Sequence, residues 1–136
     1  MKNFFKYHFL FFFWMLVIFA ESSLPSEFYP KVEIFNADKL LHMLIYGFLA
    51  MVCYISLIHQ EKVKTFYNNP LTWSLIITSL YGASDEFHQL FVPNRSCEFA
   101  DWLADFAGAL IMVLIIKYFL QNKLSLFRKS ELNYGA

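Results

Sequence analysis

Residues 40–58 read LLHMLIYGFLAMVCYISLI, and His42 is the only side chain among them that ionises near neutral pH. A helix that crosses the hydrocarbon core of a bilayer needs about 20 predominantly apolar residues. Three further stretches approach this length and composition, at residues 4–20, 71–90 and 102–120. We therefore predict an all-α integral membrane bundle of four transmembrane helices.

The overall composition agrees with burial in lipid. Hydrophobic residues make up 58% of the 136 residues, aromatic residues 21% and charged residues 16%, whereas soluble domains carry about 25% charged residues. So much apolar surface exceeds what a small soluble core can hide. The net charge is zero, and no basic face for nucleic acid is visible. We expect a single domain over residues 1–136, with a core at about 10–120 and a basic cytoplasmic tail at 121–136.

The first apolar segment has two interpretations. Lys2 and Lys6 precede it, as basic residues precede the apolar region of a secretory signal peptide. The three residues before a cut after Ala20 would be Ile-Phe-Ala, which lacks the small-x-small pattern. A retained membrane helix is the favoured reading, and cleavage remains the alternative.

Lysine and arginine predict the orientation, because cytoplasmic loops carry an excess of them. With the N-terminus inside, eight of these residues fall on the cytoplasmic side and three on the outside, namely Lys31, Lys39 and Arg95. Nine of the eleven acids fall outside or at outer helix ends. We expect a multi-pass protein of the cytoplasmic (inner) membrane with both termini in the cytoplasm.

The two cysteines are predicted to be free. Cys53 lies mid-way along the second segment and Cys97 lies in a loop. The rise of a helix puts Cys53 roughly 20 Å below the start of its own segment. Disulfides need Cα atoms within about 7 Å.

Polar side chains recur at helical spacing near the outer ends of three segments. They form three stripes: Asp38, His42 and Tyr46; Tyr81, Asp85 and Gln89; Asp101, Asp105 and Gly108. Residues three or four apart share one face of a helix. Charged groups inside membrane helices are costly and usually face a bundle interior or a wet cavity. The stripes can therefore converge on one pocket in the outer leaflet.

Each polar residue also has a structural interpretation. Asp38 and Asp101 can cap helix N-termini, and His42 can be a packing histidine. Asp85 and Glu86 are adjacent acids inside a helix, where capping does not explain them. Arg95 can pair with a loop acid, or it can clamp a phosphate or carboxylate.

The motifs resemble those of the VanZ-like family of small membrane proteins. Residues 38–42 (DKLLH) followed by Tyr46 resemble its first motif, and residues 85–95 (DEFHQLFVPNR) resemble its central segment. Residues 101–108 resemble its closing motif, and residues 22–25 (SSLP) its exit from the first helix. The resemblance covers about residues 10–115. The sequence departs from many members at Asp105, where they carry Asn.

The resemblance implies a membrane location and a set of key positions more firmly than a reaction. The family is named for a protein that raises resistance to the glycopeptide teicoplanin. We expect a cell-envelope protein that acts at the outer face of the cytoplasmic membrane. Membrane lipids would be its partners, together with an anionic lipid or cell-wall precursor headgroup held by Lys39 and Arg95, or cations and hydroxyls held by the acids.

Two other functions remain open. Asp85, Glu86, His42, Asp101 and Asp105 could hold a divalent cation of an enzyme that acts on a lipid-linked phosphate or headgroup. Buried acids could also serve a small transporter or proton relay. For every alternative the expected site residues are Asp38, Lys39, His42, Tyr46, Asp85, Glu86, Gln89, Arg95, Asp101 and Asp105.

Overall fold

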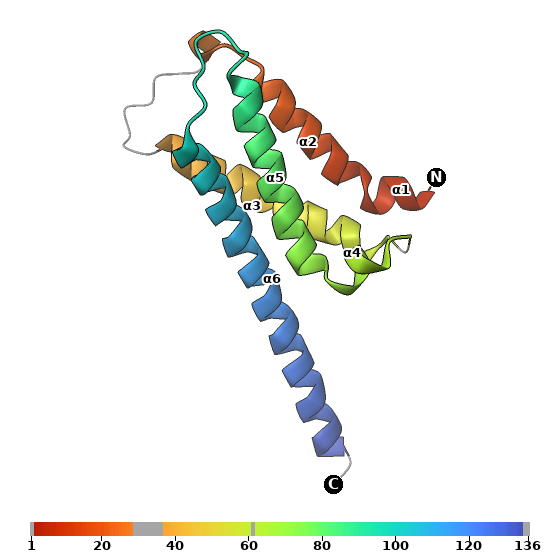
Figure 1. The fold of residues 1–136 in the computed structure, drawn as a ribbon. Helices are drawn as coiled ribbons and strands as arrows, with labels where there is room; N and C mark the ends of the chain where they lie inside the picture. Colours follow the sequence, from red (N-terminus) through yellow and green to blue (C-terminus); the bar gives the residue numbers. More distant parts are fainter. Residues whose placement is uncertain (1, 29–36, 61, 135–136) are drawn as a thin grey trace.

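The chain folds into helices joined by short connections (Figure 1). The computed structural model describes the backbone of residues 2–28, 37–60 and 62–134, and the side chains of residues 5–27, 37–60 and 62–123. Its elements are α1 (Lys2–Tyr7), α2 (Phe9–Ser22), the 3-10 turn η1 (Ser26–Phe28), α3 (Ala37–Ile58), α4 (Lys64–Asn68), α5 (Pro70–Gln89) and α6 (Phe99–Tyr134). The predicted all-α class is confirmed for these residues. The orientation argument also counted Lys31, Glu33 and Glu61, which lie outside the residues that the structure describes.

Two of the described helices are long and apolar enough to cross a membrane, namely α3 and residues Phe99–Lys123 of α6. Helix α2 is apolar but has only 14 residues. Helix α5 has 20 residues, which corresponds to about 30 Å and matches the hydrocarbon core. Its polar content, rather than its length, sets it apart from α3 and α6.

Helix α5 buries one line of polar side chains against its neighbours, while Thr72 and Ser84 are exposed. Ser74 and Thr78 are fully buried, and Asp85, Glu86 and Gln89 are nearly so. The helix packs against both α3 and α6. A polar helix surface enclosed by other helices avoids contact with lipid, which explains why α5 can be less apolar than a lipid-facing span.

Glycine permits a close contact between α3 and α6. A Cβ atom built on Gly108 would lie 2.6 Å from the Cα atom and 2.7 Å from the carbonyl carbon of Met43, and closer still to the Met43 carbonyl oxygen. A Cβ on Gly47 would lie 3.2 Å from the Gly108 carbonyl oxygen. Small residues at such crossings let two backbones approach, as is common between membrane helices.

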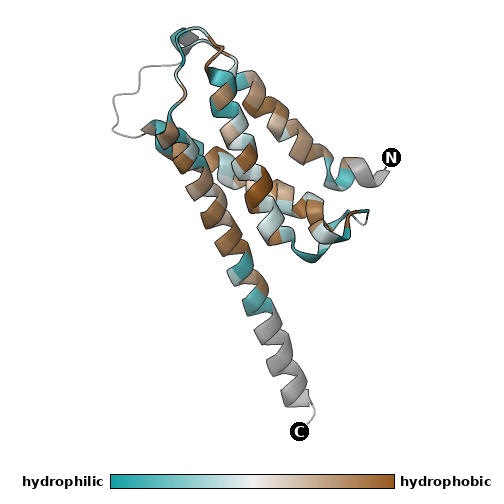
Figure 2. Cartoon of the chain, viewed as in Figure 1, coloured by the Kyte–Doolittle hydropathy of each residue, from teal (hydrophilic) through white to brown (hydrophobic). Residues whose placement is uncertain are grey.

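The outer surface of the bundle is apolar. Large hydrophobic side chains such as Phe12, Leu44, Leu80 and Phe119 are exposed. Figure 2 shows these hydrophobic stretches along α2 and the first half of α6, with hydrophilic residues near the helix ends. Apolar area on this scale is typical of a surface that contacts lipid or another protein.

Hydrogen bonds to backbone carbonyls tie α2 to the bundle. The Trp14 indole N–H donates to the Ile45 carbonyl of α3 at 3.2 Å. The Tyr81 hydroxyl of α5 donates to the Met15 carbonyl at 2.6 Å. Aromatic side chains whose polar end finds a carbonyl can bury their rings without leaving a donor unpaired.

The boundaries differ from the expected ones in two places. The segment predicted as one span at residues 4–20 is divided at His8, whose ring is 2.7 Å from the Ser56 hydroxyl of α3. Helix α6 does not end near residue 120 but continues to Tyr134, beyond the rest of the bundle (Figure 1). The tail expected after residue 120 therefore begins as a continuation of this helix. The prediction of free cysteines is confirmed, with Cys53 buried and Cys97 exposed.

Candidate functional site

Ionised side chains at the starts of α3 and α6 form an outer group of Asp38, Lys39, Glu98 and Asp101. The Lys39 ammonium lies 3.1 Å from Asp38 and 3.1 Å from Glu98, and it also pairs with Asp101. Lys39 and Asp101 are largely covered, whereas Asp38 and Glu98 are open to the surroundings. One lysine thus joins the first turn of α3 to the first turn of α6.

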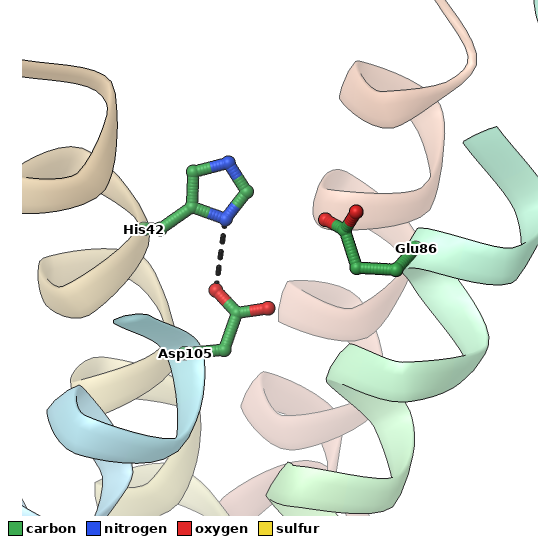
Figure 3. A group of neighbouring side chains, drawn as sticks. All are labelled: His42, Glu86 and Asp105. Carbon is green, nitrogen blue, oxygen red and sulfur yellow. Dashed lines mark hydrogen bonds and ion pairs between the residues drawn. The ribbon is translucent and has the colours of Figure 1, made fainter. Parts of the chain in front are cut away.

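One turn further along both helices lies an inner group of His42, Asp85, Glu86, Gln89 and Asp105. His42 Nδ1 lies 2.8 Å from Asp105 Oδ1, which links α3 to α6 a second time. Glu86 of α5 faces this pair (Figure 3). The residues Asp85, Glu86 and Asp105 are 6%, 3% and 0% exposed. Three buried acids beside a single imidazole are unusual, because buried charge is costly without a partner.

Asp105 is only half satisfied. Its Oδ1 contacts His42, while its Oδ2 is buried and has no hydrogen-bond partner among the described residues. Gly82 of α5 lies against this oxygen, since a Cβ there would come within 2.9 Å of it. The missing side chain at Gly82 therefore leaves room for the Asp105 carboxylate between α5 and α6.

Glu86 is held from two directions. Its Oε2 accepts a hydrogen bond from the Glu98 backbone N–H at 2.9 Å. Its Oε1 lies 3.4 Å from the Gln89 amide nitrogen, which also lies 3.3 Å from Asp85 Oδ2. These contacts fix the direction in which the carboxylate points, and they connect the inner group to the loop that carries the outer one.

Tyr46 closes the inner end of the site. It is 1% exposed, and its ring lies parallel to that of His42, with centroids 6.4 Å apart. The hydroxyl is buried and lies next to Asp85, with which it interacts without a hydrogen bond of standard geometry. Tyr46 therefore brings a buried hydroxyl beside the acids at the inner end of the site.

Arg95 is held by the loop that leads out of α2. Its Nε donates to the Leu24 carbonyl at 3.2 Å, and the neighbouring Asn94 amide donates to Glu27 at 2.8 Å. Asn94 has a positive φ of 59°, a conformation that Asn tolerates better than most residues. The prediction that Arg95 binds a phosphate or carboxylate is not supported by these contacts.

The structure thus distributes the ten expected site residues over neighbouring places. His42, Tyr46, Asp85, Glu86, Gln89 and Asp105 come together, Asp38, Lys39 and Asp101 lie one turn outside them, and Arg95 contacts the α2 exit. Sequence reasoning missed Glu98, which pairs with Lys39 and donates its N–H to Glu86. The spacing was a weak indication of this role, because Glu98 lies three residues before Asp101, directly before the start of α6.

The exterior of the bundle is apolar, and its interior holds buried acids, one of which has an oxygen without a hydrogen bond. These features are typical of a small α-helical membrane protein with a buried polar site. The sequence model of the VanZ/LLP1 family matches residues 2–121, and the chain belongs to this family. No curated protein and no solved structure matches the chain.

Proposed function

We propose that this VanZ-like protein crosses the cytoplasmic membrane with α2, α3, α5 and α6, keeps both termini in the cytoplasm, and acts on the cell envelope from the outer face. The inner group is its working site. In this role it changes susceptibility to glycopeptides such as teicoplanin. The observation that carries the proposal is the burial of three carboxylates between helices whose outer faces are apolar.

Burial of these acids is hard to explain by stability alone. An acid at the centre of a membrane helix costs about 2.5–3.5 kcal/mol by insertion measurements, and less near the interface. Among the described residues, the hydrogen-bond partners of Asp85, Glu86 and Asp105 are one imidazole, one side-chain amide and the Glu98 backbone N–H. Groups that are retained at such a cost usually bind a ligand or an ion.

The charges favour one kind of headgroup. Lys39 is already paired with three acids, and Arg95 binds the Leu24 carbonyl at the α2 exit, so neither cation belongs to the inner group. The acids of the inner group are acceptors for hydroxyl or ammonium donors. We therefore favour a lipid or cell-wall precursor headgroup recognised through its hydroxyl or amino groups over one recognised through its anionic groups.

The proposed topology puts Cys97 outside the cell. In intact cells a membrane-impermeant maleimide should label Cys97, which is exposed, and leave the buried Cys53 unmodified. The Cys97→Ser variant should remain unlabelled under the same conditions. Labelling of Cys97 only after the cells are permeabilised would contradict the orientation.

Teicoplanin susceptibility tests the functional proposal directly. Expression of the wild type in a sensitive Gram-positive host should raise the inhibitory concentration. Asp85→Asn, at matched membrane levels, should return it to that of cells without the protein, because the variant removes a buried acid while keeping its shape. Glu27→Gln is the matched control, since Glu27 is an exposed acid at the same end of the molecule. If neither the wild type nor the control changes susceptibility, the proposed role is wrong.

A further inference from the structure

We infer that His42, Glu86 and Asp105 bind a single divalent first-row metal ion, of which Zn²⁺ and Mn²⁺ are the best matches. The three residues come from α3, α5 and α6 and each offers one ligand atom (Figure 3). This inference does not depend on the proposed effect on glycopeptides, because the ion can be measured on the purified protein.

The distances fit one ion after a small adjustment. In a tetrahedral site, metal–ligand bonds of about 2.0–2.2 Å put the ligand atoms roughly 3.5 Å from one another. His42 Nδ1 and Asp105 Oδ1 are 2.8 Å apart. All three ligand atoms lie within 4.8 Å of one another. The Glu86 carboxylate has to move toward the other two ligands by somewhat more than about 1 Å to complete a tetrahedral set.

The unsatisfied atom supplies independent support. Asp105 is 0% exposed, and its Oδ2 has no hydrogen-bond partner among the described side chains and backbone. A buried carboxylate oxygen without a donor is costly. An ion held between Asp105 and Glu86 balances the charge of both acids, and bidentate binding by Asp105 brings Oδ2 as well as Oδ1 onto the ion.

The chemistry of the ligand set narrows the ion. Imidazole suits zinc and other first-row transition metals, whereas carboxylates alone suit Mg²⁺, Ca²⁺ and Mn²⁺. One nitrogen with two carboxylate oxygens is a mixed set that Zn²⁺ and Mn²⁺ accept. Hydrogen bonds from Glu98 N–H and Gln89 orient Glu86, which is how second-layer contacts commonly fix a metal ligand.

The test measures bound metal on the full-length protein purified in mild detergent. After stripping with a chelator, the protein is incubated with Zn²⁺ or Mn²⁺, separated from free ion by gel filtration, and analysed by elemental mass spectrometry. We expect about one ion per chain for the wild type and for the control Glu27→Gln. His42→Gln and Asp105→Asn should each lower metal affinity at least tenfold. A wild type that retains neither ion, or variants that load like the wild type, would overturn the inference.

If His42→Gln or Asp105→Asn fails to fold, the absorption spectrum of bound Co²⁺ still tests the inference. Replacing His42 with Cys retains a ligand and gives bound Co²⁺ a thiolate charge-transfer band that the wild type lacks. The wild type also serves as the blank for Cys53 and Cys97. A structural histidine pair would give no such band in the His42→Cys variant, and that result would also overturn the inference.

Discussion

Replacement of Gly108 by alanine should sharply lower the thermal stability of the detergent-solubilised protein. The new methyl group would lie 2.6 Å from the Met43 Cα atom, so the backbones of α3 and α6 must separate. Overpacking costs about 1–3 kcal/mol and occasionally more. Alanine in place of glycine would otherwise stabilise a helix by up to about 1 kcal/mol, so a loss has the sign opposite to that of helix propensity.

The separation of α3 and α6 in Gly108→Ala should also disrupt the contact between His42 and Asp105. Met43 adjoins His42, and Gly108 lies one turn below Asp105, so the glycine contact sets the distance at which this pair meets. The buried thiol of Cys53 reports unfolding when a thiol-reactive dye is present during heating, in a Cys97→Ser background. Gly47→Ala is the graded control, because its Cβ would lie 3.2 Å from a carbonyl oxygen, and it should lower the midpoint much less. Equal midpoints for the two variants would show that the crossing is not as close as described.

Loss of His42 should destabilise the protein more than loss of Asp105. His42→Leu leaves a fully buried carboxylate without its imidazole. Removing one partner of a buried charged pair costs about 3–5 kcal/mol. Asp105→Leu leaves an imidazole that is 22% exposed and can stay neutral, so its cost should be clearly smaller.

The double variant separates stability from function. Replacing both partners of a buried pair with apolar residues is often neutral or stabilising. His42→Leu combined with Asp105→Leu should therefore recover most of the melting temperature lost in His42→Leu, and still fail to raise teicoplanin resistance. If the double variant instead loses the sum of the stabilities lost in the two single variants, the two side chains are not energetically coupled.

Much of the fold follows from apolar runs and their polar breaks. The segments expected at residues 40–58 and 71–90 correspond to α3 (Ala37–Ile58) and α5 (Pro70–Gln89) within a few residues. Pro70 marks the start of α5 in both sequence and structure. The break at His8 could not be predicted, since it coincides with a contact to Ser56, far along the chain. Hydropathy alone could not show that α5 is the enclosed helix, because enclosure depends on how its neighbours pack.

Helical spacing predicted which residues share a depth, but not which residues meet. The spacing grouped Asp38 with His42 and Asp101 with Asp105. The structure instead pairs residues across helices, with His42 bound to Asp105 and Lys39 bound to Asp101. Those pairings depend on the rotation and separation of α3 and α6 at Gly108, and no periodicity in a single segment encodes these quantities. Glu98 was missed for a related reason, because its side chain pairs with Lys39 of another helix and its backbone N–H donates to Glu86.

The outer group also carries a net charge that acts on solutes approaching this end of the bundle. Asp38, Glu98 and Asp101 carry three negative charges against the single positive charge of Lys39, which leaves a formal charge of −2. A patch of this sign accelerates the diffusional encounter with cations and slows that with anions, and salt weakens both effects. The rate at which a cationic solute associates with the protein should therefore fall as ionic strength rises, while the inner residues set how long it stays.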